Sequence, residues 1–225
     1  MRPTLSLSAF PARLPDALLR VLRARQSQLE RREAASIATS GTCVLATYAL
    51  AAVLYAALIL IMTPQMLAGF DNNVPVSARR RLENDALHSL WTMAWSTHGL
   101  RTDPANVFHA NNFYPEPFTL AYSEHYLGIV PLFGPLWGAT GNLVAALNAY
   151  YLLSFILTGL ATFALVRAWT GSLPAGLYAG LLFAFAPPRL AQHFHIQLLG
   201  AWWLPLTLLL LDRFLRSPKI GRAHV

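Results

Sequence analysis

The stretch TCVLATYALAAVLYAALILIMT, residues Thr42–Thr63, decides the fold class. It lies within 37 consecutive residues without a formal charge, Ala34–Phe70, and Pro64 follows it directly. A helix needs roughly 20 apolar residues to cross about 30 Å of hydrocarbon. Two later uncharged runs, Ala168–Pro188 and Leu190–Leu211, also reach that length. The sequence therefore predicts an all-α integral membrane protein.

The composition indicates the same class. The 225 residues are 55% hydrophobic and 12% charged, with a mean hydropathy of +0.42, whereas an ordinary soluble domain has about 25% charged residues. The first span is not a signal peptide, because about forty mostly polar residues precede it and no small-residue cleavage site follows closely.

Small residues inside the spans favour packing roles. The single cysteine, Cys43, lies in the first span and can form no disulfide within the chain, so we interpret it as a small core residue. Gly176 and Gly180 are four residues apart and predict a face on which another helix packs closely.

The chain carries 17 arginine and lysine residues against 10 acids. Seven arginines precede the first span: Arg2, Arg13, Arg20, Arg23, Arg25, Arg31 and Arg32. Basic residues beside a membrane helix keep that end in the cytoplasm, so we expect residues 1–41 to be a cytoplasmic tail. The same clustering argues against nucleic acid as a partner. Residues 17–33 form either a basic helix on anionic membrane lipids or a solvated tail.

The region Tyr126–Val166 has 41 uncharged residues, enough for two spans or for one span preceded by a surface helix. With one span, three of the four arginines Arg167, Arg189, Arg213 and Arg216 face the cytoplasm, which the positive-inside rule favours. We therefore expect four spans, joined after the first by an outer loop of residues 64–141. The spans are expected at about 42–63, 142–166, 172–188 and 197–215.

Acids and histidines are concentrated between Asp71 and His125. The acids are Asp71, Glu83, Asp85, Asp103, Glu116 and Glu124, and the histidines are His88, His98, His109 and His125. Because uncharged segments flank this stretch, its polar groups are expected at or beyond the membrane surface. The chemistry of the protein is therefore expected in this outer loop.

Residues Asp85–Leu100 have the periodicity of an amphipathic helix. One predicted face holds Leu87, Leu90, Trp91, Ala94 and Trp95, and the other holds Asp85, His88, Ser89, Thr92 and Ser96. We expect this helix to lie flat on the outer membrane surface with its tryptophans toward lipid, with Asn84 as its N-cap and Asp85 in its first turn.

Asp85 is the first candidate for a catalytic role. A carboxylate held at a membrane surface can act as a general base toward a hydroxyl group, and the alternative is that Asp85 only stabilises the start of the helix. Arg189 is expected at the outer end of the third span. There it either contacts a lipid phosphate or reaches the lipid headgroups as an ordinary interfacial arginine.

Three histidines and one glutamate are further candidates. His193 and His195 bind phosphate or sugar, or belong to a solvated polar loop. His88 and Glu124, with His125, have the side chains of metal ligands, but no recognised ligand spacing links them. We expect no cofactor, and the alternative is a divalent metal.

Four segments carry a resemblance to a known class of enzymes. They are ENDALHSLWTMAWSTHGLRTDP (83–104), FYPEPFTLAYSEHYLG (113–128), LNAYYLLSFILTGLATFALVRAWTG (147–171) and FAFAPPRLAQHFHIQLLGAWWLPLTLLLLDRFLR (183–216). They resemble large bacterial membrane proteins placed with the GT-C class of polyprenyl-phosphate-sugar-dependent glycosyltransferases. On this resemblance, residues 42–218 are a GT-C-like transmembrane bundle of a bacterial inner membrane, and its outer loop carries surface helices.

The resemblance implies an inverting transfer of a sugar from a polyprenyl phosphate to an acceptor at the outer membrane face. Asp85 stands at the position of the catalytic base, although Ala86 stands where a second acid often lies. Arg189 and Arg101 would contact the donor phosphate. Further substrate contacts would come from His88, Glu124, His193 and His195.

A function of another class is a non-catalytic transporter or assembly component on the same scaffold. A transporter is expected to place ionisable groups near the bilayer midplane, and the expected spans hold none there, which favours the enzyme. Lys219–Val225 contains the only lysine of the chain and matches the translation of a common sequencing adapter. We therefore expect residues 219–225 to be an artefact and the chain to be an N-terminal fragment of a longer protein.

Overall fold

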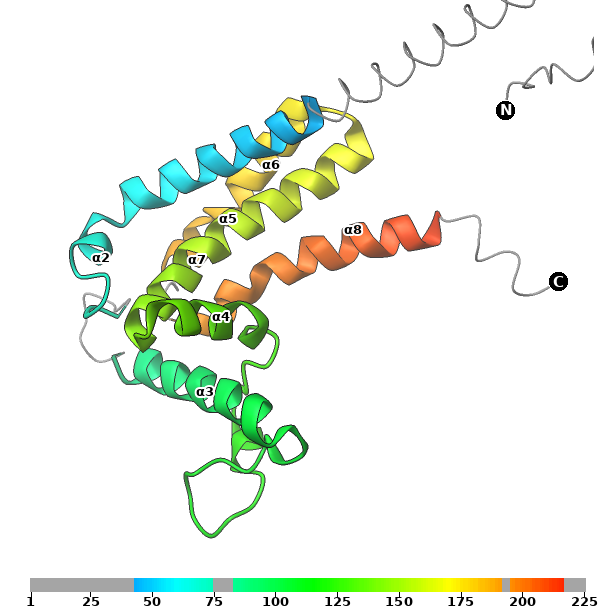
Figure 1. The fold of residues 1–225 in the computed structure, drawn as a ribbon. Helices are drawn as coiled ribbons and strands as arrows, with labels where there is room; N and C mark the ends of the chain where they lie inside the picture. Colours follow the sequence, from blue (N-terminus) through cyan, green and yellow to red (C-terminus); the bar gives the residue numbers. More distant parts are fainter. Residues whose placement is uncertain (1–42, 75–82, 192–194, 217–225) are drawn as a thin grey trace, which may run out of the picture. The chain divides into compact units, whose positions relative to one another are not determined.

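The computed structural model describes residues 43–74, 83–191 and 195–216 (Figure 1). Within these ranges the regular elements are all helices, with no strand. The chain divides into two compact units, Met1–Ala49 and Leu50–Val225. The described part of the first unit is helical, and the contacts discussed below lie in the second unit.

Three helices in the described part of the chain are long and apolar enough to cross a membrane. They are Cys43–Met62, α5 (Leu143–Thr170), and the stretch Ile196–Leu215, which consists of the 3₁₀ helix η5 (Ile196–Trp202) and α8 (Trp203–Leu215). They coincide with the expected spans at 42–63, 142–166 and 197–215. The predictions of an all-helical fold and of span-length helices at these three places are confirmed.

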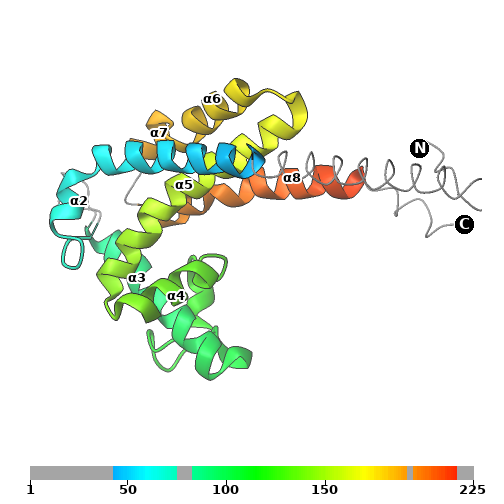
Figure 2. The ribbon, with the colours of Figure 1, turned by 45° about the horizontal axis from the view of Figure 1, so that its top comes forward.

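Helix α5 is the central helix, against which several other helices pack. It contacts α3, α4, α6, η5 and α8 (Figure 2). Asn142 caps its start, because the side-chain oxygen accepts hydrogen bonds from the N–H groups of Val144 at 2.8 Å and Ala145 at 3.0 Å. Gly171 ends it in the left-handed conformation, with φ of 68°, which glycine adopts without a side-chain penalty.

The expected span at 172–188 is not one continuous helix. Helix α6 (Leu173–Ala184) has 12 residues and is followed by a separate five-residue helix, α7 (Pro187–Ala191). Twelve residues extend about 18 Å, which is too short for about 30 Å of hydrocarbon. Pro187 and Pro188 explain the break, since neither can donate the backbone hydrogen bond that would continue α6.

Glycines bring the Cys43–Met62 helix, α5 and α6 into close contact. A Cβ atom at Gly176 would lie 2.8 Å from the ring of Phe163, and one at Gly180 would lie 2.6 Å from the carbonyl oxygen of Gly159 and overlap Tyr55. Tyr55 fills the remaining space, and its hydroxyl donates to the carbonyl oxygen of Leu177 at 3.1 Å. The predicted packing role of Gly176 and Gly180 is confirmed.

One span-length helix, rather than two, lies between Tyr126 and the end of α5. Helix α4 (Val130–Thr140) precedes α5 and has 11 residues, which extend only about 16 Å. The glycine at its C-cap, Gly141, has a φ of 64°. The preferred reading, a short helix followed by one span, therefore agrees with the structure.

The loop expected at residues 64–141 begins with α2 (Pro64–Ala68) and continues with α3 (Glu83–Thr102). Two short 3₁₀ helices follow, η3 (Pro104–Asn106) and η4 (Thr119–Tyr122). The predicted helix over Asp85–Leu100 is thus confirmed. It begins earlier than expected, because Glu83 is already helical, so Asn84 lies in the first turn and is not the N-cap.

Three residues of the polar face predicted for α3 are buried in the structure. Leu87 is 51% exposed, whereas Ser89, Thr92 and Ser96 are buried. The reason is that these hydroxyl groups find partners: Thr92 donates to the carbonyl oxygen of His88 at 2.9 Å and Ser96 to that of His125 at 2.6 Å. A hydrogen-bonded hydroxyl can be buried at little cost.

Asn148 connects the start of this loop to α5. Its side-chain amide donates to the carbonyl oxygens of Phe70 at 2.8 Å and Asn73 at 2.7 Å. Asn142 adds a hydrogen bond to the carbonyl oxygen of Asp71 at 3.1 Å. The loop therefore leaves the bundle at the N-terminal end of α5.

The glycine contact gives a direct test of the bundle. We expect Gly180→Ala to lower the free energy of unfolding by about 1–3 kcal/mol, because the added methyl group overpacks the contact with Tyr55 and Gly159. The measurement is denaturant unfolding in detergent micelles. Gly138→Ala is the matched control, since a Cβ at Gly138 meets no atom within 4 Å. Equal stability of the two variants would contradict the packing.

Candidate functional site

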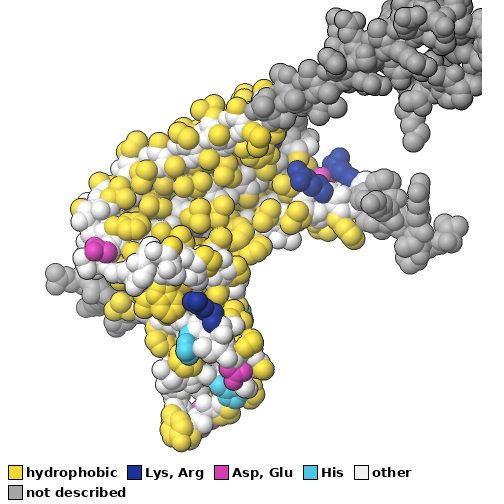
Figure 3. All heavy atoms as spheres, in the orientation of Figure 1, with side chains coloured by type: hydrophobic (Ala, Val, Ile, Leu, Met, Phe, Trp, Pro, Cys, Tyr) yellow, Lys and Arg dark blue, Asp and Glu magenta, His cyan; other side chains and the backbone are white. Residues whose placement is uncertain are grey.

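A polar cluster forms where three segments distant in sequence meet around Tyr126. We call it the Tyr126 cluster; it comprises Asp85, His88 and Ser89 of α3, Glu124 and Tyr126 of the loop before α4, and His195 and Gln197 at the start of η5. On the face in Figure 3, most acidic and histidine side chains lie over α3 and the loop after it, whereas hydrophobic side chains cover the Cys43–Met62 helix.

Tyr126 connects the three segments. Its hydroxyl shares a hydrogen bond of 2.8 Å with the Ser89 hydroxyl and donates to Oε1 of Gln197 at 3.3 Å. Its ring is buried in the hydrophobic core, and its φ of 53° is unusual for a residue other than glycine. The surrounding contacts must hold this strained backbone in place.

Two ionisable groups of the cluster have shifted pKa values. Burial raises the pKa of Tyr126, and the negative charges of Glu124 and Asp85 raise it further. The pKa of Glu124 is lowered, first by the hydrogen bond from the Ser123 hydroxyl at 2.7 Å, then by a backbone hydrogen bond and by the charges of His88 and His195. Glu124 is thus an ionised acceptor at neutral pH.

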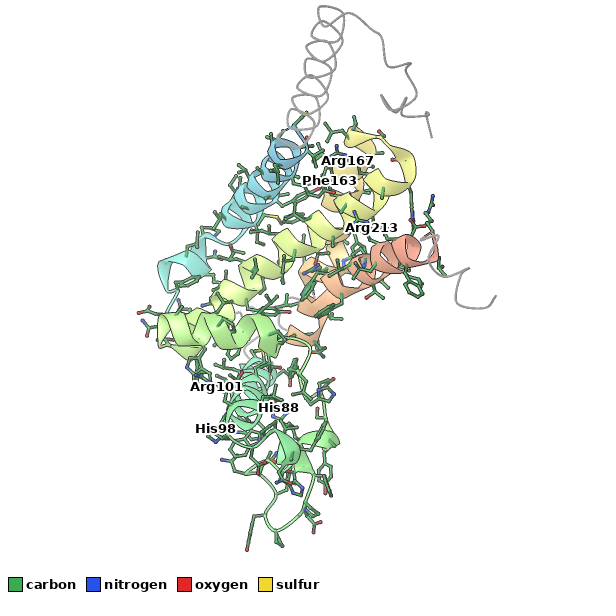
Figure 4. All side chains as sticks on the ribbon, turned by 45° about the vertical axis from the view of Figure 1, so that its right-hand side comes forward. His88, His98, Arg101, Phe163, Arg167 and Arg213 are labelled. Carbon is green, nitrogen blue, oxygen red and sulfur yellow. The ribbon has the colours of Figure 1, made fainter. Side chains whose placement is uncertain are left out.

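Asp85 and His88 stand at the solvent-exposed edge of the cluster. The His88 ring lies 5.8 Å from that of Trp91, and further ring contacts connect Trp91 to Trp95 and Trp95 to His98 along α3. Figure 4 shows both histidines on this helix. The cluster therefore offers two carboxylates, two imidazoles and a buried phenol beside an aromatic surface, a set suited to proton transfer and to binding hydroxyl groups.

The cluster contains four residues that the sequence singled out: Asp85, His88, Glu124 and His195. Tyr126 and Ser89 were missed as members. The only sequence signal for Tyr126 was the acid and the histidine directly before it, Glu124 and His125. Its positive φ cannot be predicted from the fact that it is a tyrosine. His193 lies outside the described residues. Within the described ranges, no three histidine, cysteine or acidic side chains are close enough to hold a metal ion.

Arg101 is not part of the cluster. Sixteen residues separate it from Asp85 on the same helix, about 24 Å at 1.5 Å per residue. The two side chains cannot contact one phosphate group while α3 is intact. The expectation that Arg101 contacts the donor phosphate stays a prediction, with α3 placing it at the far end of the helix from Asp85.

Arg189 also lies elsewhere than expected. It is 8% exposed, its guanidinium carbon lies 4.4 Å from the centre of the Phe155 ring, and Nη2 donates to the Ser154 hydroxyl at 3.2 Å. Its Nε and Nη1 are buried without a hydrogen-bond partner among the described residues. The early end of α6 at Ala184 explains this position, since α7 then lies level with the middle of α5 rather than beyond its end.

Comparisons with protein-family models, with curated proteins and with solved structures find no match to this chain.

Tyr126 can be tested by removing its hydroxyl. We expect Tyr126→Phe to lower the free energy of unfolding by about 1–3 kcal/mol, because the buried Ser89 hydroxyl loses its partner. Tyr122→Phe is the matched control, since Tyr122 is 61% exposed, and it should leave stability within about 0.5 kcal/mol of the wild type. Thermal unfolding in detergent measures both. If the two variants melt alike, Tyr126 does not connect the segments.

Proposed function

We propose that this protein is an inverting membrane glycosyltransferase of the GT-C class, which transfers a sugar from a polyprenyl phosphate to an acceptor hydroxyl. The observation that carries the proposal is the Tyr126 cluster, which gathers Asp85, His88, Glu124 and His195 at one end of the helical bundle. Three helices long enough to cross a membrane support a lipid-linked donor. In this proposal the N-terminus is cytoplasmic and the cluster faces the outside of the inner membrane.

Asp85 is the proposed base because it is exposed at the edge of the cluster, where an acceptor can approach. Its carboxylate takes the proton of the acceptor hydroxyl as the hydroxyl oxygen bonds to the anomeric carbon of the sugar. The bond from that carbon to the phosphate oxygen breaks in the same step, so the polyprenyl phosphate leaves with the electron pair. A single displacement from the opposite face inverts the configuration.

Histidines, rather than arginines, are the proposed partners of the leaving phosphate. His88 and His195 both lie close enough to Glu124 to lower its pKa, whereas Arg101 is too distant and Arg189 is enclosed in the bundle. An imidazole N–H can donate a hydrogen bond to a phosphate oxygen. It can therefore stabilise the negative charge that develops on the leaving phosphate.

Arg189 favours a second function, a transporter. The uncharged stretch of α5 between Asn148 and Arg167 covers 18 residues, about 27 Å, close to the thickness of the hydrocarbon. If α5 crosses the membrane with this stretch inside, Arg189 lies within the hydrocarbon beside Ser154 and Phe155. Buried charges and broken helices at such depth are typical of solute and ion pathways.

The proposed reaction is tested by Asp85→Asn in the protein reconstituted in proteoliposomes with a labelled polyprenyl phosphate sugar. We expect sugar transfer to fall by about 100-fold or more, because asparagine keeps the size of the side chain and removes the proton acceptor. Asp103→Asn is the matched control: Asp103 is an exposed acid whose carboxylate accepts a hydrogen bond from Asn106, and its replacement should leave transfer unchanged.

Two outcomes would contradict the enzyme. If Asp85→Asn transfers sugar as the wild type does while Glu124→Gln does not, Glu124 is the base and the assignment of Asp85 fails. If neither acid affects transfer, and Arg189→Gln abolishes uptake of a solute into the same proteoliposomes, the transporter replaces the glycosyltransferase as the function.

A further inference from the structure

A groove separates the C-terminal half of α3 from α4. It has a free volume of about 340 Å³ and is lined by Thr97, Leu100, Arg101, Val130, Gly134, Pro135 and Gly138. Figure 4 shows Arg101 on α3 beside α4. The volume lies in the range of small-molecule sites, which are mostly apolar with a few polar groups that fix the ligand.

The glycines of α4 explain the shape of the groove. At Gly134 the two helices are close, since a Cβ there would lie 3.2 Å from Cγ2 of Thr97. At Gly138, one turn further along α4, a Cβ would meet nothing within 4 Å. The groove therefore widens from Gly134 toward Gly138, and its walls are apolar apart from the Thr97 hydroxyl and the Arg101 guanidinium. That hydroxyl is already bonded to the carbonyl oxygen of Met93 at 2.7 Å.

Arg101 supplies a positive charge at the groove. It is exposed in the last turn of α3, and among the described residues no carboxylate lies within ion-pair distance of it. The nearest acid in sequence, Asp103, accepts a hydrogen bond from Asn106 at 2.8 Å instead. An arginine with free N–H groups binds a phosphate well, because its planar fork matches the phosphate oxygens.

We propose that this groove binds one anionic membrane phospholipid, with its phosphate on Arg101 and an acyl chain along the glycine wall of α4. Charge complementarity and an apolar wall in one groove select this occupant. A free phosphate ion would gain no binding energy from the apolar wall. A zwitterionic lipid would place its own positive charge near that of Arg101, which is unfavourable. The site is separate from the proposed reaction, because Arg101 lies about 24 Å from Asp85, and it does not depend on that reaction.

Two substitutions probe the two halves of the site. Arg101→Gln removes the charge, and Gly138→Leu fills the open end of the groove without a clash at its Cβ. Arg213→Gln is the charge control, since Arg213 is also an exposed arginine in the last turn of a helix. Ala139→Leu is the steric control, since Ala139 is exposed, next to Gly138, and does not line the groove.

The experiment counts bound lipid by native mass spectrometry of the purified chain in a neutral detergent. Phosphatidylglycerol, phosphatidylcholine and inorganic phosphate are titrated separately. We expect one phosphatidylglycerol bound in preference to phosphatidylcholine, about fivefold weaker binding in Arg101→Gln, and loss of that lipid in Gly138→Leu. Both controls should bind as the wild type does, and circular dichroism should show all variants folded.

Three results would overturn the proposal. Binding unchanged in Gly138→Leu would place the lipid outside the groove. Weakening by Arg213→Gln equal to that by Arg101→Gln would mean a general effect of charge. Displacement of the lipid by millimolar inorganic phosphate would identify a phosphate site without a role for the acyl chain. If Gly138→Leu fails to fold, the comparison of lipid binding between Arg101→Gln and Arg213→Gln decides whether the proposal stands.

Discussion

The contact of Tyr55 with Gly159 and Gly180 is the interaction on which the bundle depends. A side chain at either glycine would meet the Tyr55 ring or hydroxyl, so only glycine lets the Cys43–Met62 helix, α5 and α6 approach so closely. In lipid, helices gain little from the hydrophobic effect and associate through such close packing. With α5 held in this way, its N-terminal half carries α4, the loop tied by Asn148, and η5.

That arrangement places one group of polar side chains at the exposed N-terminal end of α5 and the enclosed charge of Arg189 beside the middle of α5. At the N-terminal end of α5, the loop and η5 converge on Tyr126, where acids and histidines remain partly or fully exposed. Beside the middle of α5, the break at Pro187 places Arg189 among Ser154 and Phe155, shielded from solvent. Electrostatic interactions are stronger at the enclosed position and are screened at the exposed one. The acids at the exposed edge are therefore suited to exchanging protons with solvent, and Arg189 to holding a fixed charge.

Sequence alone predicts the parts of this fold that depend on composition, and it fails where hydrogen bonds or backbone geometry decide. The apolar segments at 42–63, 142–166 and 197–215 locate three long helices, and the spacing of Gly176 and Gly180 predicts close packing of α6. The segment 172–188 was also read as a span because it lacks charge, yet Pro187 and Pro188 interrupt the helix. The burial of Thr92 and Ser96 on the polar face of α3 was not predicted, because it depends on their hydrogen bonds to backbone carbonyls. Four of the candidate site residues do gather, whereas Tyr126, which connects them, has no sequence signature.

Depth in a lipid bilayer is the most direct test of the central claim, that α5 crosses the membrane and places the Tyr126 cluster at its surface. Nitroxide labels at Leu160 in α5 and at Ser123 beside the cluster would be compared by power-saturation electron paramagnetic resonance, with oxygen and a water-soluble nickel chelate as relaxing agents. The account predicts that Leu160 responds mainly to oxygen and Ser123 mainly to nickel. Strong nickel relaxation at Leu160 would show that α5 is not in the hydrocarbon and would contradict the account.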